Sequence, residues 1–319
     1  MPTDTQSLRV SVAEPAAQGI ARLQLRHPQG LPLPPFTAGA HITVKTPSGA
    51  WRQYSLSNHP DETDCYEIAV KREGRGRGGS LSLVDGVRAG DLIEVGLPQN
   101  QFELDERASR VLLIAGGIGI TPLLSMARLL QSQGKPYRLV YLTRDRASTA
   151  FADLLSSPEF AASVVMHHDQ GDPNQAMDLW PLLEKSGSVQ SLQLYCCGPQ
   201  GLMDAVRDMT GHWPASAVHF ESFGVDTSVK AEDQAFEVSL NSSGRIIEVP
   251  VGLSILQALR NEGVHLPYSC ESGTCGSCKT GLLQGQADHR DLVLLEEEKA
   301  DHIMVCVSRA PGGCLVLDL

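Results

Sequence analysis

The pattern of hydrophobic and polar residues changes along the chain, and each pattern indicates a different kind of domain. Up to about residue 101, short apolar or alternating runs are separated by glycine and proline. Three of these runs, 41–45, 66–71 and 91–95, have the length and residue types of β-strands. Short strands with this turn punctuation predict a small antiparallel barrel.

Near Ser109 the pattern becomes one of strands alternating with helices. A continuous apolar run, 111–114, precedes a glycine turn and a helical stretch from 121 to about 133. Further strands are predicted at the ranges 137–142, 163–166 and 192–196. This alternation predicts a parallel sheet covered by helices on both faces. Composition alone would allow a membrane span from 111 to 130, but its glycines and proline favour a strand, a turn and a helix.

A polar segment without periodicity precedes a third small domain. From Phe236 the sequence predicts a hairpin, then a helix from Ser254 to about Asn261 and a cysteine-rich loop. We therefore expect a β-barrel domain, an α/β domain, a linker and a small C-terminal domain, at residues 1–102, 103–225, 226–235 and 236–319.

Composition and net charge limit the classes of molecule that the protein is expected to bind. A chain of 319 residues suffices for two or three domains, and 42% hydrophobic residues with 20% charged residues is ordinary for a globular protein. A net charge of −11 argues against nucleic acid and anionic membranes as partners. The first residues lack the pattern of a signal peptide, so we expect a cytoplasmic protein whose thiols stay reduced.

The cysteines near the C-terminus provide the strongest chemical signal. They follow the spacing C-x4-C-x2-C with one distant cysteine, as Cys270, Cys275, Cys278 and Cys306. This is the ligand spacing of a plant-type [2Fe–2S] cluster. Zinc is the alternative, although zinc sites usually use two separate C-x2-C pairs, and a disulfide framework is less compatible with a reducing compartment. The cysteines Cys65, Cys196 and Cys314 are interpreted as packing residues.

Two glycine-containing loops of the α/β domain suit a dinucleotide. Gly116, Gly117 and Gly119 lie between a buried strand and a helix start, where free N–H groups favour a pyrophosphate. The turn departs from G-x-G-x-x-G because Pro122 occupies the last glycine position. The segment 197–199, Cys-Gly-Pro, ends the last predicted strand, at the edge where such sheets bind ligands. A tight strand–helix link without a ligand is the alternative.

Two segments of the barrel half suit a second phosphate ligand. Residues 52–55, Arg-Gln-Tyr-Ser, place a cation, an aromatic ring and a hydroxyl on one strand. Residues 78–80, Gly-Gly-Ser, precede an apolar segment, 81–84, that could form a short helix with N–H groups for a phosphate. Ordinary strand and turn roles are the alternatives for both segments.

Taken together, these motifs resemble the phthalate dioxygenase reductase branch of the flavin- and ferredoxin-containing oxygenase reductases. The resemblance covers essentially the whole chain, because the R-x-Y-S, G-G-S, glycine-turn, C-G-P and cysteine motifs occur in the family's order. It implies a multidomain protein with an antiparallel β-barrel flavin domain, an α/β parallel-sheet nucleotide domain and a β-grasp plant-type ferredoxin domain.

The resemblance also implies the cofactors and the residues that hold them. It implies FMN rather than FAD, a [2Fe–2S] cluster on the four cysteines, and NADH as electron donor. Ser55 near the flavin N5, Thr121 between the two pockets and Phe223 over the flavin ring would act in catalysis. Asp145 suits a ribose hydroxyl of NADH, although Arg144 and Arg146 could pair with a 2′-phosphate. The residues assigned to the flavin or the nucleotide are Arg52, Gln53, Tyr54, Ser55, Ala69, Val70, Lys71, Gly78, Gly79, Ser80, Gly116, Gly117, Gly119, Thr121, Pro122, Asp145, Cys197, Gly198, Pro199 and Phe223.

The implied function is electron transfer from NADH through FMN and the cluster to a terminal oxygenase of the Rieske type. A flavin takes two electrons as a hydride and gives them up singly, which suits a one-electron cluster. The oxygenase would act on phthalate or on another aromatic acid, as in vanillate demethylase, and a monomeric reductase is sufficient. Two other interpretations remain open, a redox-sensing module without an oxygenase and a zinc domain fused to a dehydrogenase.

Overall fold

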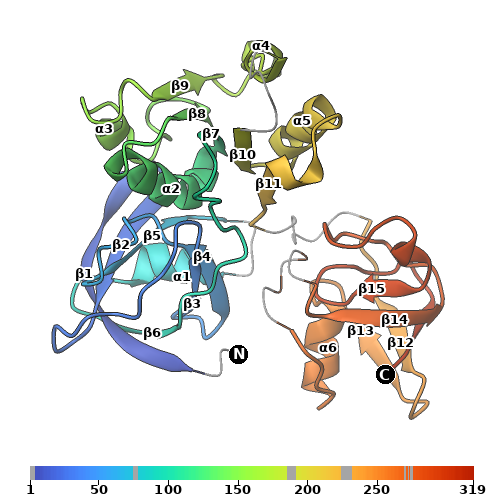
Figure 1. Cartoon of the computed structure of the whole chain (residues 1–319). Coiled ribbons are helices and arrows are strands. Elements are labelled where there is room, and N and C mark those ends of the chain that lie inside the picture. Colours follow the sequence, from blue (N-terminus) through green and yellow to red (C-terminus); the bar gives the residue numbers. More distant parts are fainter. Residues whose placement is uncertain are drawn as a thin grey trace. The chain divides into compact units, whose positions relative to one another are not determined.

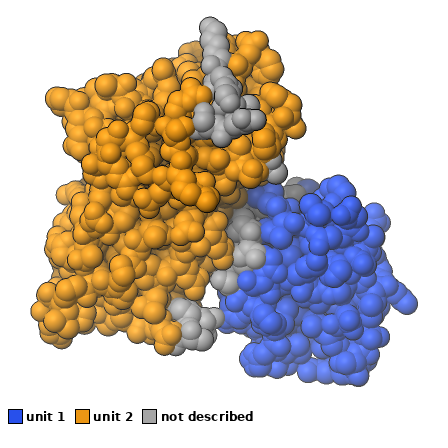
Figure 2. Space-filling model, viewed as in Figure 1, with its two compact units in different colours: residues 1, 75–77, 223–319 blue, residues 2–74, 78–222 orange. Residues whose placement is uncertain are grey.

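The computed structural model describes residues 4–74, 78–184, 192–223, 232–268, 271, 273 and 276–319. The chain divides into two compact units, one of residues 2–74 and 78–222 and the other chiefly of residues 223–319 (Figure 2). Most of the predicted linker, and both Cys270 and Cys275, lie outside the described residues.

The first part of the larger unit is an antiparallel barrel (Figure 1). Its sheet has the order β4-β3-β6-β1-β2-β5, and a bridge between Leu56 and Ile68 links β4 to β5 and closes it. Helix α1, Gly79–Gly86, confirms the predicted short helix. The strands are β1 Thr5–Ala17, β2 Ile20–Arg26, β3 His41–Lys45, β4 Trp51–Ser55, β5 Tyr66–Lys71 and β6 Leu92–Gly96.

The second part of this unit is a parallel sheet with the order β11-β10-β7-β8-β9. Odd-numbered residues of β7, such as Leu113, pack on the side of α2, whereas Leu112 and Ile114 pack on the side of α5. Helices therefore cover both faces, as predicted. The strands are β7 Arg110–Gly116, β8 Tyr137–Thr143, β9 Val164–His168, β10 Leu192–Cys197 and β11 Val218–Glu221. The helices are α2 Ile120–Ser132, α3 Ala152–Leu155, α4 Trp180–Glu184 and α5 Gln200–Thr210, with 3₁₀ turns at Gly117–Gly119 (η1), Pro173–Gln175 and Ala215–Ala217.

The barrel and the parallel sheet share one hydrophobic core. Ile20, Ala38 and Ala69 of the barrel pack in the same buried cluster as the inner face of α2. The ring of Phe102 meets that of Tyr195 edge-on, with 5.5 Å between centroids. Burial of a common apolar surface explains why the two parts form a single compact unit.

The C-terminal unit has a separate core. Its sheet has the order β13-β12-β16-β14-β15, with a parallel β12–β16 pair among antiparallel neighbours. Helix α6, Ile255–Asn261, begins with a capping box between Ser254 and Gln257 and buries its apolar face in this core. The strands are β12 Phe236–Leu240, β13 Ile246–Val249, β14 Lys279–Gln284, β15 His302–Met304 and β16 Cys314–Leu317, with a 3₁₀ turn at Glu298–Ala300.

Two sequence expectations outside the cofactor motifs have clear outcomes. Cys65 and Cys196 are buried packing residues, as predicted, but the prediction for Cys314 is wrong because this residue is exposed at the start of β16. Among the residues that the structure describes, no helix is long and apolar enough to cross a membrane. The apolar stretch from 111 to 130 is divided between β7, a 3₁₀ turn and α2.

Candidate functional site

The predicted phosphate turn of the barrel lies at the N-terminus of α1. Gly78 adopts a left-handed conformation with φ of 80°, which glycine accepts without steric cost. The side chain of Arg52 lies across Gly79, since a Cβ placed there would be 3.3 Å from the Arg52 Cγ. The Ser80 hydroxyl accepts the Glu73 N–H at 3.1 Å and can still donate its own proton. A cation, a hydroxyl and a helix N-terminus therefore meet at one corner, and this set fits a terminal phosphate.

Strand β4 carries the predicted flavin-ring residues. Arg52, Gln53 and Tyr54 are partly buried, whereas Ser55 is buried. Burial raises the pKa of Tyr54 to about 12, so its phenol stays neutral and can offer a ring face and a hydroxyl. Ser55 pairs with His41 across the antiparallel ladder, at the end of β4 next to the bridge that closes the barrel.

The three residues predicted on β5 have different surroundings. Ala69 packs in the core shared with the nucleotide domain, and Val70 packs in the barrel core. Their side chains are therefore already buried by protein, so contact with a flavin would have to use the main chain. Lys71 is exposed and pairs with Glu73 at 3.6 Å.

The two nucleotide loops lie in direct contact at the carboxyl edge of the sheet. A Cβ on Gly119 would lie 2.1 Å from the Cys197 carbonyl oxygen, and one on Gly116 would lie 2.6 Å from Pro199 Cδ. A Cβ on Gly198 would in turn meet the backbone of Gly116 at 2.9 Å. These three glycines are therefore required for close packing between the loops after β7 and β10, a reason that differs from the ligand approach expected from the sequence.

Gly117 is the glycine of this turn that faces open space. It has φ of 53°, and no atom lies within 4 Å of a Cβ placed on it. The following helix α2 begins at Ile120, with Thr121 and Pro122 buried in its first turn. The Thr121 hydroxyl donates to the Ile118 carbonyl oxygen at 3.1 Å. An open glycine next to a helix N-terminus fits a pyrophosphate.

Asp145 follows β8 at the same edge of the sheet. Its Oδ1 accepts the Ser148 N–H at 2.8 Å, and this backbone hydrogen bond lowers the pKa of the carboxyl group. Asp145 therefore organises its own turn as an ionised group. A carboxylate with one oxygen engaged can accept a ribose hydroxyl with the other and repels a 2′-phosphate.

Glu221 belongs to this site and was missed by the sequence analysis. It ends β11 beside Cys197 of β10, and its Oε2 accepts the Ser55 hydroxyl at 3.2 Å. Burial raises the pKa of Glu221 to about 8, so the carboxyl group is largely protonated at neutral pH. The available signal was an acidic residue between Phe220 and Phe223 at the end of a short strand, where an exposed charge would be the ordinary interpretation.

The described cluster cysteines lie together in the C-terminal unit. Cys278 directly precedes β14 and Cys306 follows β15, and both are buried. Both thiols belong to the same buried cluster of that unit, beside the last pair of the β14–β15 ladder, Lys279 with Met304. Two buried thiols at neighbouring strand ends fit a cluster held by four thiolates. Cys270 and Cys275 lie outside the described residues.

Phe223 is not brought into the flavin site by any described contact. In the sequence it is the first residue of the C-terminal unit after Ser222, and 45% of its surface is exposed. Its role over the flavin ring stays a prediction from the resemblance.

Comparisons with known proteins agree with this arrangement. A family model described as a 2Fe-2S iron-sulfur cluster binding domain matches residues 238–311. The match decides for the iron–sulfur cluster and against zinc. The phthalate dioxygenase reductase of Burkholderia cepacia is 55% identical, over 98% of this chain and 97% of that protein. A vanillate O-demethylase oxidoreductase from a Pseudomonas species is 39% identical, over 97% of this chain and 98% of that protein.

A solved structure is also similar over the whole chain. It is a phthalate dioxygenase reductase described as a modular structure for electron transfer from pyridine nucleotides to [2Fe–2S]. Its TM-score is 0.89 at 54% identity, with 99% of this chain and 98% of that chain covered. The likeness includes the barrel, the parallel sheet and the ferredoxin fold, so the expected fold class is confirmed.

Proposed function

The chain belongs to the phthalate dioxygenase reductase family of iron–sulfur flavoprotein oxidoreductases, and from this premise we propose that it carries electrons from NADH through FMN and a [2Fe–2S] cluster to a Rieske-type terminal oxygenase. When bound, the flavin supplies the conversion of a two-electron hydride into single electrons. The protein binds and aligns the two organic cofactors and tunes the cluster.

One observation carries the proposal. The Ser55 hydroxyl of the flavin motif donates to Glu221 at the carboxyl edge of the parallel sheet, at 3.2 Å. This is the edge of an open α/β sheet where ligands bind, and it also holds the two glycine loops. The flavin motif and the nucleotide loops therefore meet at one place, as direct hydride transfer requires.

The residues of the chain have distinct roles in this proposal. Arg52 and the N-terminus of α1 hold the flavin phosphate, and the open Gly117 and the N-terminus of α2 hold the pyrophosphate of NADH. Glu221 keeps a proton close to Ser55, where charge changes during flavin reduction. Tyr54, Thr121 and Phe223 orient and cover the rings. Asp145 favours NADH over NADPH.

The remaining parts of the proposal concern the domain boundaries, the oligomeric state and the partner oxygenase. We assign residues 1–102 to the flavin domain, 103–225 to the nucleotide domain, 226–235 to the linker and 236–319 to the ferredoxin domain. The protein acts as a cytoplasmic monomer without a membrane or nucleic-acid partner. The partner oxygenase takes phthalate, in line with the similarity to the phthalate dioxygenase reductase of Burkholderia cepacia, and vanillate is the second candidate because of the more distant demethylase oxidoreductase.

Anaerobic mixing of the purified protein with NADH tests the electron path. We expect bleaching of the flavin absorbance followed by bleaching of the iron–sulfur absorbance, and rapid NADH-dependent reduction of cytochrome c. Slow turnover would favour a sensor, and a preparation without flavin or iron would contradict the proposal. Turnover of phthalate and of vanillate with the corresponding purified oxygenases then identifies the partner.

A further inference from the structure

A buried carboxylate outside the cofactor motifs lies in the larger unit. Glu67 is on β5, and only 1% of its surface is exposed. Its Oε2 accepts Arg22 Nε at 2.7 Å and Gln24 Nε2 at 3.1 Å, both from the neighbouring strand β2. Its Oε1 accepts the Ser57 hydroxyl at 3.0 Å. These contacts hold the carboxylate in one orientation within the barrel.

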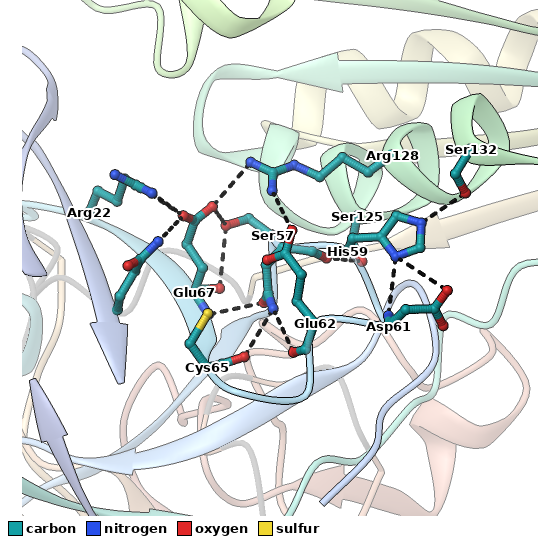
Figure 3. A network of polar contacts seen from close by, with 12 residues as sticks. Arg22, Ser57, His59, Asp61, Glu62, Cys65, Glu67, Ser125, Arg128 and Ser132 are labelled. Atoms are coloured by element: carbon teal, nitrogen blue, oxygen red, sulfur yellow. Dashed lines mark hydrogen bonds and ion pairs between the residues drawn. The ribbon is translucent and has the colours of Figure 1, made fainter. Parts of the chain in front are cut away.

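A second arginine reaches the same carboxylate from the nucleotide domain. Arg128 is on α2, and its Nη2 lies 3.4 Å from Oε1 of Glu67 (Figure 3). Its Nη1 lies 3.8 Å from Oε1 of Glu62, in the loop before β5. Burial raises the pKa of Glu67, but the charges of Arg128 and Arg22 outweigh it and hold the pKa below its usual range. Glu67 is therefore an ionised group shared by two domains.

Further hydrogen bonds join α2 to the same barrel loop. The Ser125 hydroxyl donates to the Asn58 carbonyl oxygen at 2.8 Å, and the Ser132 hydroxyl lies 2.9 Å from His59 Nε2. Ser125, Arg128 and Ser132 are three and four residues apart, a spacing that places them on one face of the helix. One polar stripe of α2 is thus fixed to the barrel loop from residue 57 to residue 67 (Figure 3).

Helix α2 and the barrel loop, which meet in this contact, each lead along the chain to residues of the proposed site. The first turn of α2 carries Thr121 and follows the nucleotide turn directly. On the barrel side, Ser57 follows Ser55 by two residues, and its backbone N–H donates to the Glu67 carbonyl oxygen at 2.8 Å. A shift of α2 against this loop would therefore move the nucleotide turn relative to Ser55.

We propose that Glu67 is a positioning residue for hydride transfer, because through Arg128 it fixes α2 and the nucleotide turn relative to Ser55. This inference rests on the proposed function, in which the hydride leaves NADH as it is oxidised and reduces FMN. Hydride transfer requires reacting atoms roughly 3–3.5 Å apart, and a misplacement of about 1 Å can lower a rate about a hundredfold. Binding of either cofactor depends on other residues and is much less sensitive to such a shift.

Rapid-mixing kinetics of the full-length holoprotein test the proposal. Glu67→Gln keeps the shape of the side chain without its charge, and Arg128→Gln removes the cation from the nucleotide domain. We expect the rate of flavin reduction at saturating NADH to fall about tenfold to a hundredfold in both variants, while the KM for NADH changes little. Arg128→Lys restores a cation and should recover part of the rate. The isotope effect with NADH deuterated at the transferred position should reach its full value in the slow variants.

Matched controls separate positioning from folding. Arg26→Gln, on the same strand as Arg22 and paired with exposed Asp64, should leave the rate unchanged. Ser125→Ala removes one contact of the polar stripe of α2 but leaves the ion pairs of Arg128. We expect this variant to bind a normal amount of flavin and to reduce it more slowly than the wild-type protein.

The outcomes are distinct. Wild-type rates in Glu67→Gln and Arg128→Gln would overturn the proposal. If those variants lose flavin or do not fold, a wild-type rate in Ser125→Ala would overturn it instead. Failure of the wild-type protein to reduce its flavin would contradict the proposed function itself rather than the role of Glu67.

Discussion

The carboxylate groups of Glu67 and Asp233 are both buried, and each is held by two arginines. The arginines around Glu67 come from two domains, whereas those around Asp233 come from one. The partners of Glu67 are Arg22 of the barrel and Arg128 of the parallel-sheet domain. The partners of Asp233 are Arg290 and Arg309, which lie within its own unit. The chemistry is the same in both places, so the difference lies in which segments are joined.

The hydrophobic cores around the two carboxylates differ in the same way, because one is shared by two domains and the other belongs to one unit. Barrel residues such as Ile20 and Ala69 share a core with α2, whereas the core of the C-terminal unit contains only residues from 236 onward. Removing either carboxylate takes a buried ion-pair partner from two arginines, which is costly in both places even though Arg128 keeps Glu62 and Arg290 keeps Asp288. Around Glu67, loss of the ion pairs also changes the alignment of the proposed flavin and nucleotide sites. Around Asp233 it affects only the stability of one domain.

The largest effect is expected from removal of a cluster ligand. Cys278→Ser removes a buried thiol and should abolish the iron–sulfur absorbance and the reduction of cytochrome c. NADH-dependent reduction of ferricyanide should remain, because the flavin and nucleotide sites lie in the other unit. Cys314→Ser, at an exposed cysteine outside the motif, is the control and should change neither activity. Loss of flavin reduction in a folded Cys278→Ser protein would show that the flavin and nucleotide sites depend on the cluster.

Asp233→Asn should destabilise only the C-terminal unit. The side chain of Asp233 is 3% exposed, and although burial lowers the pKa of Arg290, hydrogen bonds to Asp233 and Asp288 outweigh it and raise that pKa. Removing one partner of a buried ion pair costs up to about 3–5 kcal/mol when the other charge is left alone, and the cost is smaller here because Arg290 keeps Asp288. We expect earlier thermal loss of the iron–sulfur absorbance with unchanged reduction of ferricyanide. Asp301→Asn, at a side chain that is 70% exposed, should have almost no effect. Equal destabilisation by both substitutions would contradict the prediction.

The two carboxylates also show how far the sequence can predict such a molecule. Alternation in residues 66–71 predicted β5 correctly, but in an isolated barrel strand Glu67 would be assigned to the solvent-facing side. It is buried because residues of α2, about sixty positions later, cover that side. Glu221 was missed for a similar reason, since its hydrogen bond with Ser55 joins residues that are 166 positions apart. Local periodicity predicts elements, whereas contacts between domains are not encoded in any local pattern.

The glycine loops were predicted, but the reason for two of their glycines was not. Gly116 and Gly119 matched a motif that is continuous in the sequence. Their close approach to the loop after β10 depends on the pairing of β7 with β10, which lie about eighty residues apart. The cysteine motif depends less on distant contacts, because three of its four predicted ligands lie within nine residues.

Gly119→Ala tests whether the larger unit depends on this loop contact. The added Cβ would lie 2.1 Å from a backbone carbonyl oxygen, so the two nucleotide loops would have to separate. We expect flavin reduction by NADH to slow about a hundredfold, with the cluster absorbance unchanged. Gly201→Ala, at a glycine of α5 with open space around its Cα, should leave the rate unchanged and stabilise the helix slightly. A wild-type rate in Gly119→Ala would show that the loops tolerate separation.

The smallest effect is a pH dependence that arises from Glu221. Burial raises the pKa of Glu221 to about 8 in the folded protein, from 4.5 as the ordinary value. Between these two values the folded protein holds a proton that the unfolded chain has released, so the free energy of unfolding falls as pH rises. The stabilising contribution is complete below pH 4.5 and is lost as the pH rises to about 8. Glu221→Gln cannot titrate and should lack this component. Unfolding of the larger unit in denaturant at several pH values measures the difference between the two proteins. A constant difference from pH 5 to pH 9 would mean that Glu221, like Glu67, is ionised in the folded state, and would contradict the prediction.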